Sequence, residues 1–430
     1  MNLKVFFVLT KILNSARLLT LILCSLSFCL SVGKANAACV GESDAPFACS
    51  HQITAIEFEW NSHQEHANGA DNWPITWADD NHQYTAWGDG FGYLGNEQKR
   101  SFGVSKIVGN PPNYVGSDVY LGAVASCSGI GSAGDNTLIC GKSYSILSYE
   151  GFLVLWAGPE SGAAGFTQSR FFYSRDKGQS WTQTTHVFTG NDYYHPTFIQ
   201  FGKDNQGPND GYAYHYGTEL QSTGSLSVQS PGRVYLARQK LSDYFAPILN
   251  APAGQADLFD PDDSAFIIEY FIGLNNGVAQ WSTNRNSKVI VFADPNGVGW
   301  NMSVSFNQGS GRYILMTEHG ASFQGKLGIF DAAEPWGPWT TVAYYNDWAD
   351  QTSAPGTTGD KGFFWNISNK WSNANNIVML FTGVGGDDSF NSLNATLSIN
   401  SPPLNPPTTP PPTPNDKPVM APIIFILNDE

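Results

Sequence analysis

Short runs of aromatic and β-branched residues recur along the central part of this chain, each bounded by Gly, Asn, Asp or Pro. No long stretch repeats its apolar residues with the 3.6-residue period of an amphipathic helix. Runs of this kind are typical of β-strands, and the turn residues mark where one strand ends and the next begins. The pattern therefore predicts an all-β fold.

The most informative stretch is residues 71–89, DNWPITWADDNHQYTAWGD. Two strand-like segments, Trp73–Trp77 and His82–Gly88, flank a turn and predict a β-hairpin. Folding about that turn brings Asp71 within one residue of facing Asp89, and directly opposed residues have Cβ atoms about 4.5–5.5 Å apart. Two carboxylates held together are costly unless they are used, and acid/base work on a glycosidic bond is their commonest use. The plain alternative is that Asp89 starts an Asp-Gly turn and Asp71 caps a strand.

The same order of strand, turn and second aromatic strand recurs along the chain. It occurs at Asp71–Gly90, Lys142–Gly158, His195–Glu219, Trp300–His319 and Phe364–Gly383. With further strands after each unit, the repeat predicts a five-bladed β-propeller of four-stranded antiparallel blades. Six blades are the alternative, because the third and fourth units start about a hundred residues apart. The strand Ile53–Trp60 would complete the last blade and leave no free edge.

Two further segments fit this architecture. Ser174–Trp181 matches the Asp-box, S-x-D-x-G-x-[ST]-W, in which the Asp bonds to turn amides and the Trp packs between sheets. Glu334–Trp339, EPWGPW, precedes a strand and resembles the G-P-W turn common in glycosidase propellers. We interpret both as architectural.

The ends of the chain and its charge indicate an exported protein. Lys and Arg total 22 against 37 acidic residues, a net charge of −15 that disfavours nucleic acid and anionic membranes as partners. A basic start, the apolar run Leu18–Leu30 and the segment Ala35–Ala37 are typical of a signal peptide, which leaves no membrane span after processing. We expect a secreted or periplasmic monomer. Its predicted parts are a signal peptide (1–37), a propeller domain (38–400), a Pro/Thr-rich linker (401–418) and a short tail (419–430).

Four cysteines remain after the signal peptide, an even number in an oxidising compartment. Three pairings exist, and the short loops favour Cys39–Cys49 and Cys127–Cys140. No cofactor is predicted to be required. Paired loop acids leave a structural Ca²⁺ site as an alternative, although no EF-hand-like spacing is present. These acids are Asp79, Asp80, Asp262, Asp263, Asp387 and Asp388.

In a propeller, the starts of the inner strands and the ends of the second strands meet at one mouth. Aligning the units by their turns places three carboxylates there, Asp71, Asp89 and Glu318, as candidate catalytic residues. The candidate substrate-binding residues at the same mouth are Lys142, His195, Trp300, Asn301, His319 and Trp365. A register slip of one residue would turn these side chains to the other face. Each also has a plain alternative as a turn residue, a strand end or, for the tryptophans, core packing.

Several of these segments together resemble a known family. The matching segments, in chain order, are DNWPITWADDNHQYTAWGDGFGY, GKSYSILSYEGFLVLW, the Asp-box, HPTFIQFGKD, GWNMSVSFN, YILMTEHG and EPWGPW. They resemble a bacterial domain of unknown function, similar to the five-bladed glycosidase propellers, whose characterised relatives include endo-D-arabinanases. The resemblance spans roughly residues 52–398. It implies that two early aspartates, Asp71 and Asp89 here, carry the activity.

The sequence therefore predicts an exported glycoside hydrolase, endo-acting and arabinanase-like, that cleaves a polysaccharide or cell-wall glycan. One of Asp71 and Asp89 would be general base or nucleophile, and the other, or Glu318, general acid. Inversion is expected, because the related propellers mostly invert. A polysaccharide lyase acting on uronic acids, with His195, His319 and Lys142 in its site, is one alternative. A non-catalytic glycan-binding propeller is the other.

Overall fold

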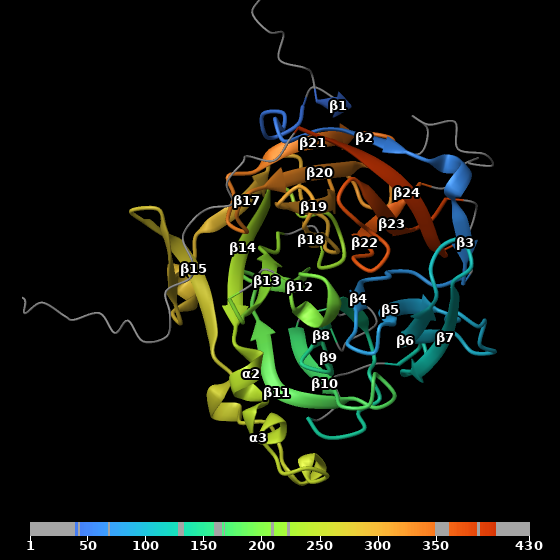
Figure 1. Ribbon diagram of the computed structural model, residues 1–430, viewed down its shortest axis with the longest axis vertical. Coiled ribbons are helices and arrows are strands. Elements are labelled where there is room, and N and C mark those ends of the chain that lie inside the picture. The colour runs from blue at the N-terminus through green and yellow to red at the C-terminus, as the bar shows by residue number, and fades with distance from the viewer. Residues whose placement is uncertain are drawn as a thin grey trace, which may run out of the picture. The chain divides into compact units, whose positions relative to one another are not determined.

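A computed structural model describes residues 39–400 of this chain, except 42–43, 68, 128–132, 159–165, 167, 208–209, 222–223, 349–360 and 385–387. The expected signal peptide, linker and tail lie outside the described residues. The fold is all-β, as predicted, and its sheets are curled. Figure 1 shows the strands β4, β8, β12, β18 and β22 grouped around one centre, with the later strands of each sheet further out.

The first two sheets each hold four antiparallel strands in sequence order. One contains β4 (Ile75–Trp77), β5 (Gln83–Gly90), β6 (Arg100–Val108) and β7 (Val115–Leu121). The other contains β8 (Lys142–Tyr149), β9 (Phe152–Gly158), β10 (Gln168–Ser174) and β11 (Thr182–Thr189). The strands β8 and β9 are buried along almost their whole length, so both faces of this sheet lie against other elements.

The third sheet joins two antiparallel runs through two parallel pairs, Ile199 with Val304 and Gln200 with Ser305. The first run holds β12 (Tyr194–Gln200), β13 (Ala213–Thr218), β14 (Gly232–Gln239), β15 (Ile268–Asn275), β16 (Val278–Ser282) and β17 (Ile290–Asp294). The second holds β18 (Ser303–Asn307), β19 (Arg312–Glu318), β20 (Leu327–Ala332) and β21 (Thr340–Tyr345), with β1 (Val40–Gly41) parallel to β21.

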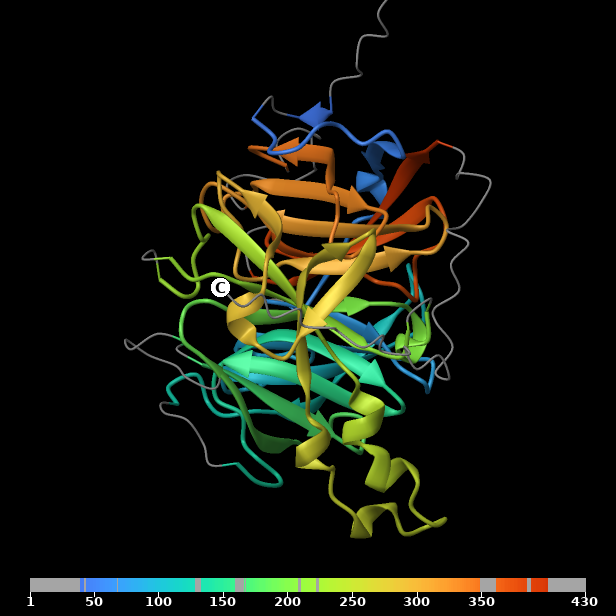
Figure 2. The same ribbon diagram turned by 90° about the vertical axis from the view of Figure 1, so that its left-hand side faces the viewer.

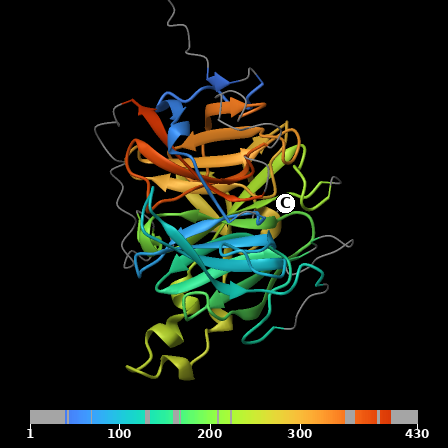
Figure 3. The ribbon, with the colours of Figure 1, turned by 90° about the vertical axis from the view of Figure 1, so that its right-hand side faces the viewer.

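The last sheet brings the two ends of the described chain together. It contains β22 (Phe363–Ile367), β23 (Asn376–Thr382) and β24 (Phe390–Ile399), joined by β2 (Ile53–Phe58) and β3 (Gln64–His66) from the start of the chain. Both early strands pair antiparallel with β24, which confirms that the early strand completes the last sheet. Figure 3 shows blue β2 and β3 beside red β24.

Neighbouring sheets, and the two runs of the third sheet, pack against each other through separate apolar clusters. A further cluster joins the last sheet back to the first, where Trp73 lies with Leu380 and Phe390. The rings of Trp73 and Phe390 are 5.2 Å apart, centroid to centroid, and perpendicular. The core is therefore a closed series of interfaces rather than one central mass.

The long interval between the third and fourth units holds an outward excursion, residues 241–290, that the repeat did not predict. Its hairpin β15–β16 and its short helices lie at the outer edge (Figures 1 and 2). The helices are α2 (Leu241–Tyr244), α3 (Ala246–Leu249), η3 (Ala256–Leu258), η4 (Asp263–Ala265) and η5 (Arg285–Ser287). Two more 3₁₀ turns lie elsewhere, η1 (Trp60–Ser62) and η2 (Lys203–Asn205).

Both expected disulfides are present, Cys39–Cys49 and Cys127–Cys140. In the turn 174–181, Asp176 accepts hydrogen bonds from the Ser180 amide at 2.9 Å and from the hydroxyl of Ser174 at 2.8 Å. The indole of Trp181 is buried in the cluster between the first two sheets. This turn therefore fixes a sheet interface and lies apart from the chain's centre.

The interface between the last sheet and the first provides the first test. Replacing Trp73 by Ala removes a fully buried indole from the only described cluster that joins the first sheet to the last. Large-to-small changes of buried aromatics cost about 3–5 kcal/mol, because they lose transfer free energy and leave a cavity. We expect that loss in denaturant unfolding. Leu258→Ala, at a side chain 78% exposed, is the control and should change little. Equal effects would contradict the assignment of this interface.

Candidate active site

The hairpin β4–β5 forms with the predicted turn, and Ile75 pairs with Thr85. Further out, Asp71 pairs with Gly88 rather than with Asp89. The shift occurs because Asn72 adopts a left-handed backbone, φ 64°, just before Trp73. The two carboxylates are thus offset by one residue, as the sequence allowed, and they do not face each other across the hairpin.

The carboxylate of Asp71 is held by Lys142, the first residue of β8 in the neighbouring sheet. The Lys142 ammonium donates to both carboxylate oxygens, at 2.8 and 3.1 Å. Both side chains retain slight exposure, 15% for Asp71 and 12% for Lys142, so water or a ligand can reach the pair. Burial raises the pKa of Asp71, and the charge of Lys142 opposes that rise.

Gly88 makes room for this ion pair. A Cβ at Gly88 would lie 3.0 Å from Cδ of Lys142 and 2.9 Å from the carbonyl oxygen of Ser101. The stem of Lys142 therefore lies across the backbone of β5, in the space that any other residue would fill. The position of the ammonium on Asp71 depends on this glycine.

Asp89 is the more open of the two aspartates. Its backbone is left-handed, φ 50°, and its side chain, 48% exposed, pairs with Lys99 at 3.0 Å. It still acts on its neighbour, because the charges of Asp388 and Asp89 both raise the pKa of Asp71. Asp388 was predicted only as a loop acid. It reaches this end of the sheets from the segment before β24, a proximity that no local sequence pattern shows.

Glu318 ends β19 and is completely buried. Its Oε1 accepts a hydrogen bond from the backbone amide of Phe323 at 2.7 Å, and its Oε2 is buried with no hydrogen-bond partner among the described residues. Burial raises the pKa of Glu318 to about 8, and the Phe323 bond opposes this rise. At neutral pH this carboxyl therefore carries a proton.

An aromatic cluster fills the centre of the same end. Tyr144, Tyr194, Trp300 and Phe364 form it, one from each of four inner segments. The rings of Trp300 and Phe364 lie 4.8 Å apart, and those of Tyr144 and Trp300 lie 6.1 Å apart. All four are buried, so Trp300 presents little surface in this conformation. Sequence analysis missed the two tyrosines, which differ in no visible way from core tyrosines elsewhere.

The two candidate histidines lie in different surroundings. His195 has its ring against Tyr144, 4.9 Å between centroids, and its Nδ1 is 2.9 Å from the hydroxyl of Thr218. Burial lowers the pKa of His195 to about 3. His319 instead stacks on Tyr344 of the outer strand β21, 3.8 Å between centroids, and burial lowers its pKa to about 4. The structure does not bring His319 together with Asp71.

Asn301 joins the fourth unit to the first, because its Nδ2 donates a hydrogen bond to Oδ1 of Asn72. Asn72 in turn donates from its Nδ2 to the carbonyl oxygen of Ser143 at 2.6 Å. Asp71, Lys142, His195, Trp300 and Asn301 thus belong to one connected region. Trp365 does not, since it packs beside Trp348 in the core between the last two sheets, 5.7 Å between ring centroids.

Two absences hold within the described residues. No group of three or more His, Cys, Asp or Glu side chains there is placed to hold a metal ion. No described helix is long and apolar enough to cross a membrane. A structural Ca²⁺ ion stays a prediction, since one of the paired acids, Asp387, lies outside the described residues.

No protein-family model matches this sequence, and no curated protein matches it. Solved structures with a similar fold include a beta-xylosidase, 9% identical. The match covers 79% of this chain and 96% of the beta-xylosidase chain, with a TM-score of 0.42. A GH43_1 enzyme from Xanthomonas citri is 11% identical over 78% of this chain and 91% of its own, TM-score 0.42. A family 117 glycoside hydrolase from Zobellia galactanivorans is 8% identical over 80% and 91%, TM-score 0.38.

The buried carboxyl of Glu318 predicts a pH-dependent stability. The pKa of Glu318 in the folded protein, about 8, exceeds the ordinary value of 4.5. The protonated carboxyl therefore contributes fully to the free energy of unfolding below pH 4.5, and this contribution is lost as the pH rises through 8. Glu318→Gln removes that loss. We expect the free energy of unfolding of the variant, relative to wild type, to increase by about 2–4 kcal/mol from pH 5 to pH 9. Denaturant titrations measure it, with the exposed Glu57→Gln as control. A constant difference over this range would overturn the assignment.

Proposed function

We propose that this protein is an exported glycoside hydrolase that cleaves a polysaccharide or cell-wall glycan at the end of the sheets that carries Asp71. The observation that supports this most strongly is the Asp71–Lys142 pair, a partly accessible carboxylate fixed by a cation from the next sheet. Two disulfides fit the oxidising environment of an exported protein.

Asp71 is assigned as the general base. Lys142 favours its ionised form, while burial and the nearby charges of Asp388 and Asp89 raise its proton affinity above that of an ordinary aspartate. A base whose pKa lies nearer the working pH takes a proton from water more effectively. Hydrolysis by such a base, acting on a water opposite the leaving group, inverts the anomeric centre.

The proton donor is assigned to Glu318, with Asp89 as the other candidate. Burial raises the pKa of Glu318 to about 8, so this carboxyl keeps its proton at neutral pH. Its Oε1 is held by the Phe323 amide, so donation to a glycosidic oxygen requires the turn after β19 to move away from it. Asp89 is open to solvent already and needs no such movement.

Substrate binding is assigned to Lys142, His195, Asn301 and Trp300, and Tyr144 is added to them. The assignment leaves out Trp365 and His319, which lie apart from Asp71. The substrate class follows from the resemblance to the arabinanase-related family, which makes an endo-acting arabinanase the specific form of the proposal. Among the described elements, each of the five inner strands starts an antiparallel run and each neighbouring pair of runs shares an apolar cluster. These features support five blades rather than six.

One observation favours the non-catalytic glycan-binding propeller as a second candidate. Glu318 and the aromatic cluster are buried, so part of the proposed machinery is covered in this conformation.

The lyase gains no such support, because His195 and His319, its candidate bases, are buried with pKa values of about 3 and 4. Imidazoles of such low basicity are weak bases at neutral pH.

The activity test compares wild type with Asp71→Asn and Asp89→Asn on a panel of plant, algal and bacterial glycans, by reducing-end and ultraviolet assays. We expect new reducing ends from at least one glycan and no ultraviolet-absorbing product. Removing a general base lowers the rate by about 10²- to 10⁴-fold, so Asp71→Asn should fall by that amount. Asp79→Asn, at an exposed aspartate paired with Lys177, is the matched control. Glycan binding without cleavage in all four proteins would establish the second candidate instead.

The role of Lys142 is tested by the pH profile. Lys142 lowers the pKa of Asp71, so Lys142→Met should raise that pKa and move the acid limb of kcat/KM to higher pH. Gly88→Ala, which displaces the lysine stem, should move the limb in the same direction. The control is Lys99→Met, which removes the partner of Asp89, a lysine more exposed than Lys142. It should move the acid limb less. An unmoved limb in Lys142→Met would remove Asp71 from the role of base.

A further inference from the structure

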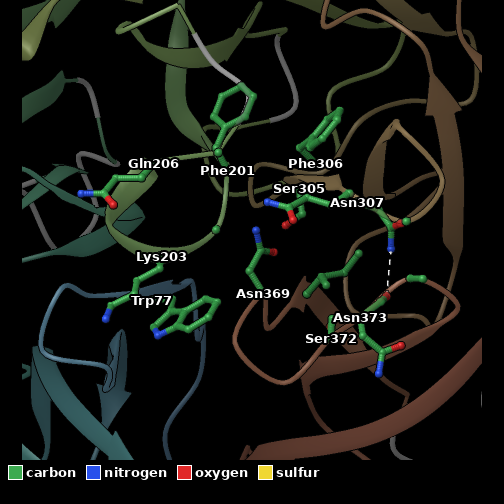
Figure 4. A pocket seen from close by; sticks show the side chains of 16 residues that line it. Trp77, Phe201, Lys203, Gln206, Ser305, Phe306, Asn307, Asn369, Ser372 and Asn373 are labelled. Carbon is green, nitrogen blue, oxygen red and sulfur yellow. Dashed lines mark hydrogen bonds between the residues drawn. The ribbon is translucent and has the colours of Figure 1, made fainter. Parts of the chain in front are cut away.

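A cavity of about 660 Å³ lies at the opposite end of the inner strands from Asp71. Four inner strands run towards it. The strand β4 ends at Trp77, β18 ends at Asn307, β22 ends at Ile367, and Phe201 follows the end of β12, and each of these residues lines the cavity. Figure 4 shows Trp77, Lys203, Phe306 and Asn369 around this space.

The lining has a consistent chemistry. It combines aromatic side chains, Trp77 and Phe306 among them, with amides such as Gln206, Gln308 and Asn369. The described lining residues include no Asp, Glu, His or Cys, and Lys203 supplies the only charge among them. Such a surface offers no acid/base pair and no metal ligands. It offers flat apolar faces and hydrogen-bond donors and acceptors, the combination that binds an uncharged sugar ring and its hydroxyls.

These groups are available to a ligand. Gln206 and Gln308 are exposed, and both line the cavity. Trp77 is partly exposed, and its ring is fixed by a hydrogen bond from Nε1 to Oδ1 of Asn81 at 3.1 Å. Asn369 donates from Nδ2 to the carbonyl oxygen of Gln200 at 3.0 Å, which sets the orientation of its amide. Fixed side chains lose little entropy on binding.

This cavity is separate from the proposed active site. Between the two ends, the axis is packed by residues such as Tyr144, Phe198 and Met302, which leave a space of about 10 Å³. That is about the least volume that holds one water molecule, so no sugar passes through it. The cavity is therefore a site of its own.

We infer that this cavity is a non-catalytic binding site for an uncharged oligosaccharide segment. Its volume lies within the range of ligand sites in proteins. The inference does not depend on the hydrolase activity, because it rests on the cavity alone. If the carboxylate end does cleave a glycan, the cavity holds a second part of the same polymer or a neighbouring chain.

The test is isothermal titration of the full chain carrying Asp71→Asn, with linear arabino-, xylo- and cello-hexaoses and a hexamer of galacturonic acid as probes. In this background a substrate is not consumed. We expect one of the neutral hexamers to bind and the acidic hexamer to bind more weakly. Trp77→Ala should weaken that binding by about tenfold or more, as truncation of a central aromatic anchor does.

Two further variants complete the design. The pair Gln206→Ala/Gln308→Ala changes only exposed side chains, so it keeps the test valid if Trp77→Ala does not fold. Phe259→Ala, at an exposed aromatic of the outer excursion, is the matched control and should leave binding unchanged. A neutral-glycan isotherm that neither cavity variant changes, in affinity or in stoichiometry, would overturn the inference, as would binding of the acidic hexamer alone or of no hexamer. The cavity proposal and the hydrolase proposal are tested separately, because Asp71→Asn should abolish hydrolysis and leave hexamer binding in the cavity intact.

Discussion

The closed series of aromatic interfaces is the constraint on which the rest of this structure depends. A sheet whose two faces are both apolar needs a neighbour on each side, and here the last neighbour of β22–β24 is the first sheet. Trp73 and Phe390 form that junction, while β2 pairs with β24 to join the two ends of the chain. Because the sheets meet face to face, the starts of their inner strands are brought to one end and their finishes to the other.

Three of the five inner strands have an unusual backbone near their start. Asn72, His195 and Phe364 all adopt left-handed backbones just before β4, within β12 and within β22. Such conformations cost non-glycine residues of order 1–3 kcal/mol and persist only where surrounding contacts fix them. Threonines that end the second strands supply such contacts: the Asn72 amide donates to the hydroxyl of Thr382 at 3.1 Å, and His195 contacts Thr218. The kink breaks the strict alternation of side chains along β12 and β22, where the pairing register shifts.

This kink also explains how far the sequence could predict the site. All five hairpins formed as expected, because alternating residues and turn signals are local properties that each segment carries by itself. The facing partner of Asp71 is Gly88 rather than Asp89, since the left-handed Asn72 shifts the pairing by one residue. Trp365 follows Phe364 and is turned into the core by the same kind of irregularity. The Asp71–Lys142 contact joins different sheets, so only the three-dimensional fold could show it.

The two ends of the inner strands differ in chemistry because they are built from different parts of the repeat. The strand starts at one end carry the Asp71–Lys142 pair, whereas the residues that line the far cavity are mostly uncharged and include the amides of Gln206 and Gln308. Asp71 and Trp77 lie at opposite ends of one short segment, at most about 20 Å apart at roughly 3.3 Å per residue. The packed axis between them means that a single glycan could reach both ends only by passing around the outside of the sheets. If the carboxylate end cleaves a glycan as proposed, a ligand in the far cavity therefore cannot position the bond to be cleaved. What it can do is keep a polymer close to the protein, which raises the local concentration of other segments at the carboxylate end.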